Sequence, residues 1–154
     1  MSLEAPTVCL SVCERKTSRV SPIVCYGLKN GNIGALELNG EESIVLWEVD
    51  CAEEGKAPCA FIEVTTIKDE LHLVVARDDG SIELYWFEEK SASANLVFET
   101  KQDETITGLA CGFITSATKK EIIFTCFSGA VKSIIDKKAV KRLGTLQEDP
   151  KAAT

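Results

Sequence analysis

Short apolar, β-prone runs alternate with polar turns along this chain, and the clearest pair flanks residues 78–80. The run Leu71–Arg77 leads into the turn Asp-Asp-Gly, and Ser81–Glu88 returns as a second β-prone run. An Asx-Gly turn between two such runs is a strong hairpin signal, because glycine supplies the positive φ that these tight turns need. The stretch therefore predicts a β-hairpin.

The same hairpin pattern recurs twice more at a constant interval. The turn glycines are Gly31, Gly80 and Gly129, and the spacing from 31 to 80 and from 80 to 129 is the same, 49 residues. Each unit reads as four antiparallel strands. Repeats of about 40–50 residues with four strands each are typical of β-propeller blades.

We therefore predict an all-β fold of three four-stranded antiparallel repeats, forming an incomplete β-propeller over residues 1–147. The blades are expected at about 5–50, 56–100 and 105–147, and residues 148–154 are expected to be a disordered tail. In the central blade, strands two and three carry apolar residues on both faces. Sheets that are stacked between two neighbours need that pattern.

Three blades are too few to close a ring, because propellers typically have four to eight. Two apolar blade faces would stay open, and large open apolar faces mark interaction sites. We therefore expect self-association, most simply two copies that together make six blades.

Composition narrows the classes of partner. The chain has 154 residues, of which 45% are hydrophobic, but no apolar run approaches the roughly 20 residues that span a bilayer. Seven cysteines without a secretory signal indicate a reducing, cytoplasmic compartment. The net charge of −7 argues against nucleic acid and anionic membranes, although ordinary solubility also explains it.

The sequence offers no convincing catalytic, cofactor or metal site. His72 is the only histidine, so no histidine pair can form. The cysteine spacings lack the repeated close pairs of zinc sites, and Asp78 with Asp79 is too few oxygen ligands for calcium. We interpret those two acids as turn residues and expect no enzyme activity.

Two features are candidate partner contacts. Trp47 lies on the outermost strand of its blade, where we expect partial exposure, whereas Trp86 is expected in the core between blades. The chain has one basic cluster, which is a solvated face or a docking site for acidic partners. The cluster consists of Lys132, Lys137, Lys138, Lys141 and Arg142.

The strings at 75–88 and 121–131 resemble propeller segments of the seventh family of Bardet–Biedl syndrome proteins, and 26–33 resembles the preceding blade. The sequence departs from that pattern at Ala76, where glycine is expected, and at Asn30, where aspartate is expected. Members of the family are longer, with more blades before this region and a coiled coil after it.

The resemblance implies a non-catalytic scaffold subunit of the BBSome, a coat complex that carries membrane proteins to and from cilia or flagella. The implied partners are other BBSome subunits and membrane-protein cargo. The implied location is the cytoplasm, the cilium or flagellum, and the basal body.

Two other functions compete with this interpretation. An enzyme built on a propeller is disfavoured, because three blades cannot enclose a channel that gathers polar groups. A kelch or WD-type adaptor unrelated to cilia is the second alternative. The paired glycines of kelch repeats and the Trp-Asp pair of WD repeats are absent.

Overall fold

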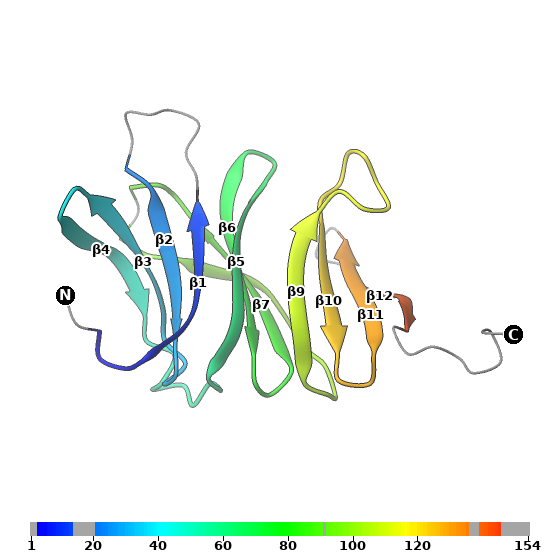
Figure 1. The fold of residues 1–154 in the computed structure, drawn as a ribbon. Coiled ribbons are helices and arrows are strands. Elements are labelled where there is room, and N and C mark those ends of the chain that lie inside the picture. The colour runs from blue at the N-terminus through cyan, green and yellow to red at the C-terminus, as the bar shows by residue number, and fades with distance from the viewer. Residues whose placement is uncertain (1–2, 14–20, 91, 136–138, 146–154) are drawn as a thin grey trace, which may run out of the picture.

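The computed structural model describes residues 3–13, 21–90, 92–135 and 139–145. Within these residues the chain is all-β, with twelve strands in three separate four-stranded antiparallel sheets (Figure 1). The predicted fold class is therefore confirmed. The expected tail lies outside the described residues.

Each blade is a simple up-and-down meander in chain order. Blade one contains β1 (Thr7–Cys13), β2 (Ile23–Leu28), β3 (Ile33–Asn39) and β4 (Glu42–Val49). Blade two contains β5 (Cys59–Ile67), β6 (Glu70–Arg77), β7 (Ser81–Phe87) and β8 (Asn95–Lys101). Blade three contains β9 (Ile106–Gly112), β10 (Glu121–Cys126), β11 (Ala130–Ile135) and β12 (Ala139–Thr145).

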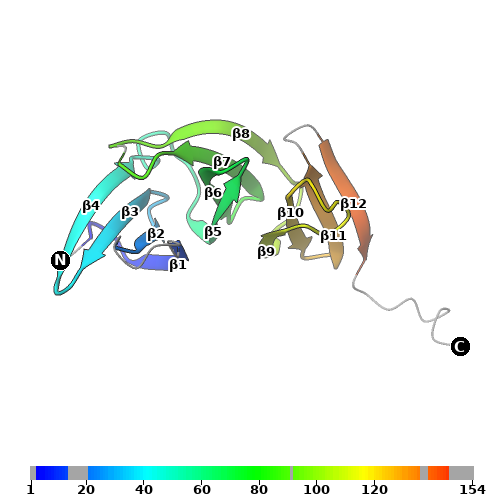
Figure 2. The ribbon, with the colours of Figure 1, turned by 90° about the horizontal axis from the view of Figure 1, so that it is seen from above.

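The three blades stand side by side along an open arc (Figure 2). Strands β1, β5 and β9 lie on the concave side of the arc, and β4, β8 and β12 lie on the outside. Among the described residues each ladder stays within one blade. The blades are therefore held together by side-chain packing and by their linkers rather than by a continuous sheet.

The central blade contributes to two cores, one on each face. In β7, Tyr85 and Phe87 pack toward blade one, whereas Ile82 and Leu84 pack toward blade three. Strand β6 alternates in the same way, and all of its core positions are fully buried. Both faces of this sheet are thus covered, as the apolar pattern of the two strands predicted.

The hairpin glycines lie in turns with left-handed backbone. Gly31, Gly80 and Gly129 have φ angles of 96°, 89° and 88°. In the β5–β6 turn, Lys68 and Asp69 have φ of 51° and 63°, which is a geometry that usually selects Asn and Gly. That turn and the β9–β10 loop both lie at the upper edge of the molecule in Figure 1, on neighbouring blades.

The outer face of blade one, which points away from blade two, is apolar and open. In β1, Ser11 faces blade two and accepts a hydrogen bond from the Val64 amide at 3.0 Å. Its neighbours Leu10 and Val12 therefore point the other way, and they are 63% and 58% exposed.

Candidate functional sites

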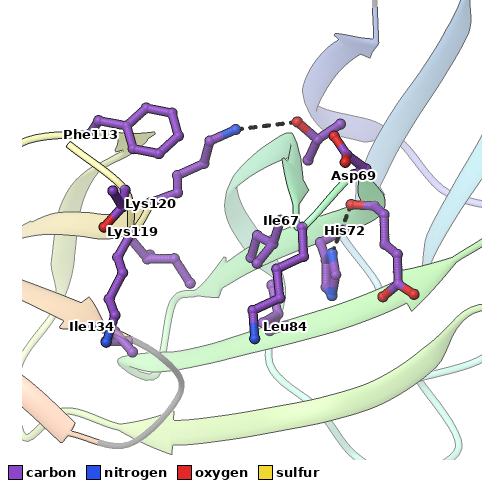
Figure 3. A pocket seen from close by; sticks show the side chains of 13 residues that line it. Ile67, Asp69, His72, Leu84, Phe113, Lys119, Lys120 and Ile134 are labelled. Atoms are coloured by element: carbon purple, nitrogen blue, oxygen red, sulfur yellow. Dashed lines mark hydrogen bonds between the residues drawn. The ribbon is translucent and has the colours of Figure 1, made fainter. Parts of the chain in front are cut away.

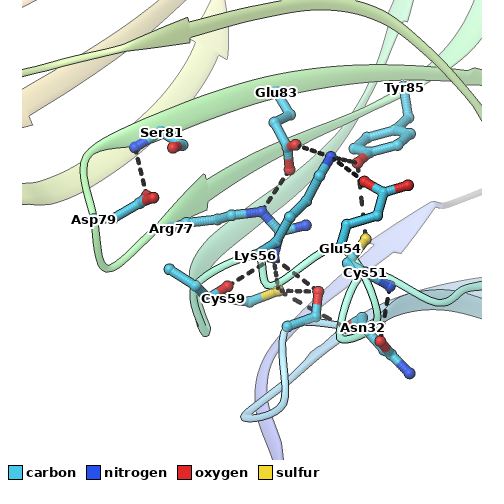
Figure 4. Close-up of polar contacts among 12 residues, drawn as sticks. Asn32, Cys51, Glu54, Lys56, Cys59, Arg77, Asp79, Ser81, Glu83 and Tyr85 are labelled. Carbon is cyan, nitrogen blue, oxygen red and sulfur yellow. Dashed lines mark hydrogen bonds and ion pairs between the residues drawn. The ribbon is translucent and has the colours of Figure 1, made fainter.

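A buried polar cluster joins blade two to the linker that enters it (Figure 4). The carboxylate of Glu83 in β7 is its centre. It accepts hydrogen bonds from Nε of Arg77 and from Nζ of Lys56, each at 2.5 Å. Glu83 and Arg77 are almost completely buried, so this charge is paired on two sides in a medium where unpaired charge is costly.

The cluster also connects blades one and two. Nη1 of Arg77 donates to the carbonyl oxygens of Gly31 and Ala57, each at 2.8 Å. Gly31 lies in the β2–β3 turn of blade one, and Ala57 lies in the linker. One guanidinium therefore binds the turn, the linker and the second blade together.

Asn32 holds the start of the same linker. Its side-chain oxygen accepts from the backbone amides of Cys51 and Ala52 at 2.9 and 3.0 Å. Its amide group donates to Glu48 at 3.3 Å, and Glu48 also accepts from the Tyr26 hydroxyl at 2.6 Å. These contacts are internal and hold the linker to blade one, so this part of the cluster is structural.

The charges in the cluster reinforce one another. Burial alone would lower the pKa of Lys56, but the hydrogen bond and the negative charge of Glu83 outweigh it and raise that pKa. The pKa of Arg77 is raised by Glu83 in the same way, against the effect of burial. Both side chains therefore stay cationic, as an ion pair requires.

The thiols are poor candidates for chemistry. Burial raises the pKa of Cys25 and of Cys111 to about 12, and that of Cys59 to about 11. A thiol in this state is a small apolar side chain rather than a nucleophile. Among the described residues, no group of three or more His, Cys, Asp or Glu side chains is arranged to hold a metal ion.

A groove of about 850 Å³ opens between blades two and three (Figure 3). Its lining combines the β5–β6 turn, the β9–β10 loop and apolar side chains of the inter-blade core. Leu84, Ile122 and Ile134 form the floor, because they line the groove yet are 0%, 5% and 2% exposed.

His72 lies beside this groove and is buried (2% exposed). Its Nδ1 is 3.0 Å from the Glu70 carbonyl oxygen, so the ring is held by its own strand. This position suits a structural histidine.

The two tryptophans differ from expectation in their burial: Trp47 is buried and Trp86 is only half-buried. Trp47 is 3% exposed, and its ring lies 5.3 Å from that of Phe87, in the core between blades one and two. The expectation that it is partly exposed is therefore wrong. Trp86 is only half-buried and belongs to neither core cluster, so its expected place in the core is also wrong.

A bulge explains the position of Trp47. The β3–β4 register shifts between Ala35 and Leu36, so that Trp47 pairs with Ala35 whereas Val45 pairs with Leu36. The skipped residue changes which side chains share a face. Trp47 thereby falls on the face that packs against blade two.

The basic cluster of the sequence is only partly placed. Lys137 and Lys138 lie outside the described residues. Lys141 and Arg142 lie in β12, where their backbones pair with Ser133 and Lys132. Lys132 donates to the side chain of Gln102 at 2.9 Å. A docking role for these positions therefore stays a prediction.

Sequence reasoning did not find the groove. The signals that point to it are the exposed Phe113 and the pair Lys119-Lys120, which lie in a polar stretch between two strands. Their juxtaposition with the β5–β6 turn depends on how two blades pack.

Solved structures with the same architecture define the class of this protein. The chain is similar to Saccharomyces cerevisiae Sqt1, with a TM-score of 0.61 and 12% identity over 89% of this chain and 34% of that one. It is also similar to the WD40 domain of fission yeast SCAP, with a TM-score of 0.58 and 20% identity over 86% and 30%. At these identities the likeness shows the fold alone, which is a β-propeller with three blades present.

The family model described as the BBS7 beta-propeller matches residues 1–135, so the chain belongs to the BBS7 β-propeller family. A relative in Caenorhabditis elegans, BBSome complex member bbs-7, is 30% identical over 112 residues, covering 73% of this chain and 15% of the relative. Mouse BBSome complex member BBS7 is 27% identical over 127 residues, covering 80% and 17%. The family resemblance inferred from the sequence is therefore confirmed.

The chain spans only about a sixth of the length of these curated relatives. The family match favours the BBS7 family over the alternative of an unrelated kelch or WD-type adaptor. The WD40-like structures share the fold with this chain, but they do not show a common family. No helix among the described residues is long and apolar enough to cross a membrane.

Proposed function

We propose that this chain is a non-catalytic interaction module of a BBSome subunit, a scaffold in the trafficking of membrane proteins to and from cilia or flagella. The observation that supports it most is the BBS7 family match over residues 1–135. The buried polar cluster agrees with a scaffold, because Arg77, Glu83 and Lys56 hold blade one, the linker and blade two together.

The partners proposed are other BBSome subunits and membrane-protein cargo, met in the cytoplasm, at the basal body and in the cilium. The open apolar face of blade one exposes Leu10 and Val12, and burial of these side chains favours the binding of a partner. It also supports self-association, in which two copies supply six blades and cover each other's open faces.

The test is affinity purification of the tagged chain from ciliated cells, with the captured proteins identified by mass spectrometry. We expect BBSome subunits to be enriched over a control purification with a tagged WD40 propeller of similar size. Absence of every BBSome subunit from the captured proteins would refute the proposed function.

A further inference from the structure

The groove between blades two and three has an apolar floor and an exposed aromatic wall. Its floor residues, Leu84, Ile122 and Ile134, belong to the inter-blade core. Phe113 on the β9–β10 loop is 59% exposed and lines the same groove, and the adjacent Ile114 is 61% exposed. Such large side chains beside a hollow favour the binding of an apolar side chain from a partner.

The two rims of the groove differ in charge. Lys119 and Lys120 lie on the blade-three rim, and Asp69 lies opposite them on the β5–β6 turn (Figure 3). Altogether three lysines and two carboxylates line the groove, in a chain that has 24 acidic and 17 basic residues. The groove therefore has a cationic wall on a molecule that is acidic overall, and that wall attracts carboxylates.

The cationic wall is held in shape before any partner arrives. Oγ of Ser116 accepts hydrogen bonds from the backbone amides of Thr118 and Lys119 at 3.2 and 3.1 Å. Thr115 donates its hydroxyl hydrogen to the buried carboxylate of Glu121 at the start of β10. An ordered loop loses little conformational entropy on binding, and binding is tighter for that reason.

Lys120 links the wall to the aromatic ring and to blade two. Its Nζ lies 5.5 Å from the centre of the Phe113 ring and 3.4 Å from Oγ1 of Thr66 in β5. A cation over the face of an exposed aromatic places charge and apolar surface side by side. That pairing matches a ligand in which an acidic residue follows an apolar one.

We propose that this groove binds an extended acidic peptide segment of a partner protein. One large apolar side chain of the segment packs against Phe113 and the groove floor, and its carboxylates lie over Lys119 and Lys120. The inference deepens the proposed interaction role, but it does not depend on which complex the partner belongs to.

The test is fluorescence polarisation with the purified chain and a labelled peptide of about eight residues, in which a Leu-Phe pair is flanked by Glu. We expect a Kd on the order of 10–100 μM that weakens as salt is raised. The same peptide with Lys in place of Glu is expected to bind at least about tenfold more weakly.

Paired variants locate the binding site. K119E/K120E is expected to weaken binding at least about tenfold, whereas K29E/K101E, which changes the net charge equally at exposed positions outside the groove lining, has little effect. F113A is expected to weaken binding about fivefold. F127A is its control, because Phe127 is 80% exposed in the β10–β11 turn and does not line the groove. E70K, which removes a carboxylate from the rim, is expected to strengthen binding.

Three results would overturn the proposal. They are preferential binding of the Lys peptide, equal loss in K119E/K120E and K29E/K101E, and equal loss in F113A and F127A. If the groove variants failed to bind the peptide yet captured BBSome subunits normally, the groove would be separate from complex assembly. If the chain bound the peptide but captured no BBSome subunit, the proposed function alone would fail.

Discussion

At the scale of single residues, Arg77 joins three parts of the chain through one side chain. It is 1% exposed, and it contacts the carboxylate of Glu83, the turn at Gly31 and the linker at Ala57. A buried cation of this kind is stable only while its carboxylate partner is present. The contact between blades one and two therefore depends on Glu83.

Replacing Glu83 with Gln should lower the free energy of unfolding by about 3 kcal/mol, because two cations lose their counter-charge in a buried site. Chemical denaturation followed by tryptophan fluorescence would measure it, since Trp47 lies in the core between the same two blades. Glu99 pairs with Glu83 across the β7–β8 ladder but is exposed, so E99Q is the matched control and should have little effect. Equal stability of the two variants would contradict a structural role for the cluster.

The buried thiols predict a loss of stability at alkaline pH. Burial raises the pKa of Cys25 and Cys111 from 9.0 to about 12, so the unfolded chain releases these protons at lower pH than the folded chain. Their contribution is therefore complete below about pH 9 and decreases as pH rises toward 12, by up to about 1.4 kcal/mol per pH unit for each thiol. The pKa values of Tyr26 and Tyr85 are also raised, which acts in the same direction.

Urea denaturation across this pH range would measure the effect. The midpoint should fall steadily above pH 9, and C25A should show a shallower dependence on pH than the unmodified chain. A midpoint that stays constant from about pH 9 to 11 would contradict burial of these thiols.

At the scale of elements, the hairpin turns of blades one and two pack directly against the backbone of the linker that leads to the next blade. A Cβ on Gly31 would lie 2.8 Å from the Lys56 carbonyl oxygen, and one on Gly80 would lie 2.5 Å from that of Gln102. The Gln102 amide also donates to the Gly80 carbonyl oxygen at 2.9 Å. Glycine is therefore required at these turns for space as well as for positive φ.

This double requirement can be separated by two substitutions. Gly40 also has positive φ, at 64°, but a Cβ there would meet nothing within 4 Å. G40A should thus cost only the backbone term of about 1–2 kcal/mol, and G80A should cost about 1–3 kcal/mol more because of the clash with the linker. Thermal denaturation of both variants would test this. Similar losses of stability in G40A and G80A would show that the linker moves aside without an energetic penalty.

At the scale of the whole molecule, the arc leaves the outer face of blade one uncovered. Leu10 at 63% and Val12 at 58% exposure share this face with Leu38 and Val45, each 41% exposed. If two copies cover these faces, light scattering should report twice the mass of one chain. We expect L10D to shift the protein to the monomer without unfolding it, because Asp is tolerated at an exposed position but not in an apolar interface.

The control for that experiment is V97D. Val97 is 42% exposed on β8, the outermost strand of the central blade, where a neighbouring blade would not pack. V97D should leave the mass unchanged. A monomeric unmodified chain at micromolar concentration would contradict self-association.

Local signals explain which parts of the fold were predictable. Hairpin turns select glycine, and strands covered on both faces select continuous apolar runs, so the four-strand unit and its repeat could be read from the order of residues. The residues of the buried polar cluster were harder to predict from the sequence. Arg77 was not predicted to be important, because its structural role depends on hydrogen bonds to Gly31 and Ala57. These residues are 46 and 20 positions away in the chain.

The amino-acid sequence by itself determined the all-β class, the three repeated units and their family, because strand propensity, turn chemistry and repeat length are encoded within short stretches of chain. Only the tertiary structure decided which tryptophan is buried, how the linkers pack against the turn glycines, and where Lys120 contacts blade two. These features depend on a bulge that shifts the register of one strand pair and on the packing of neighbouring blades. Neither leaves a trace in the order of residues.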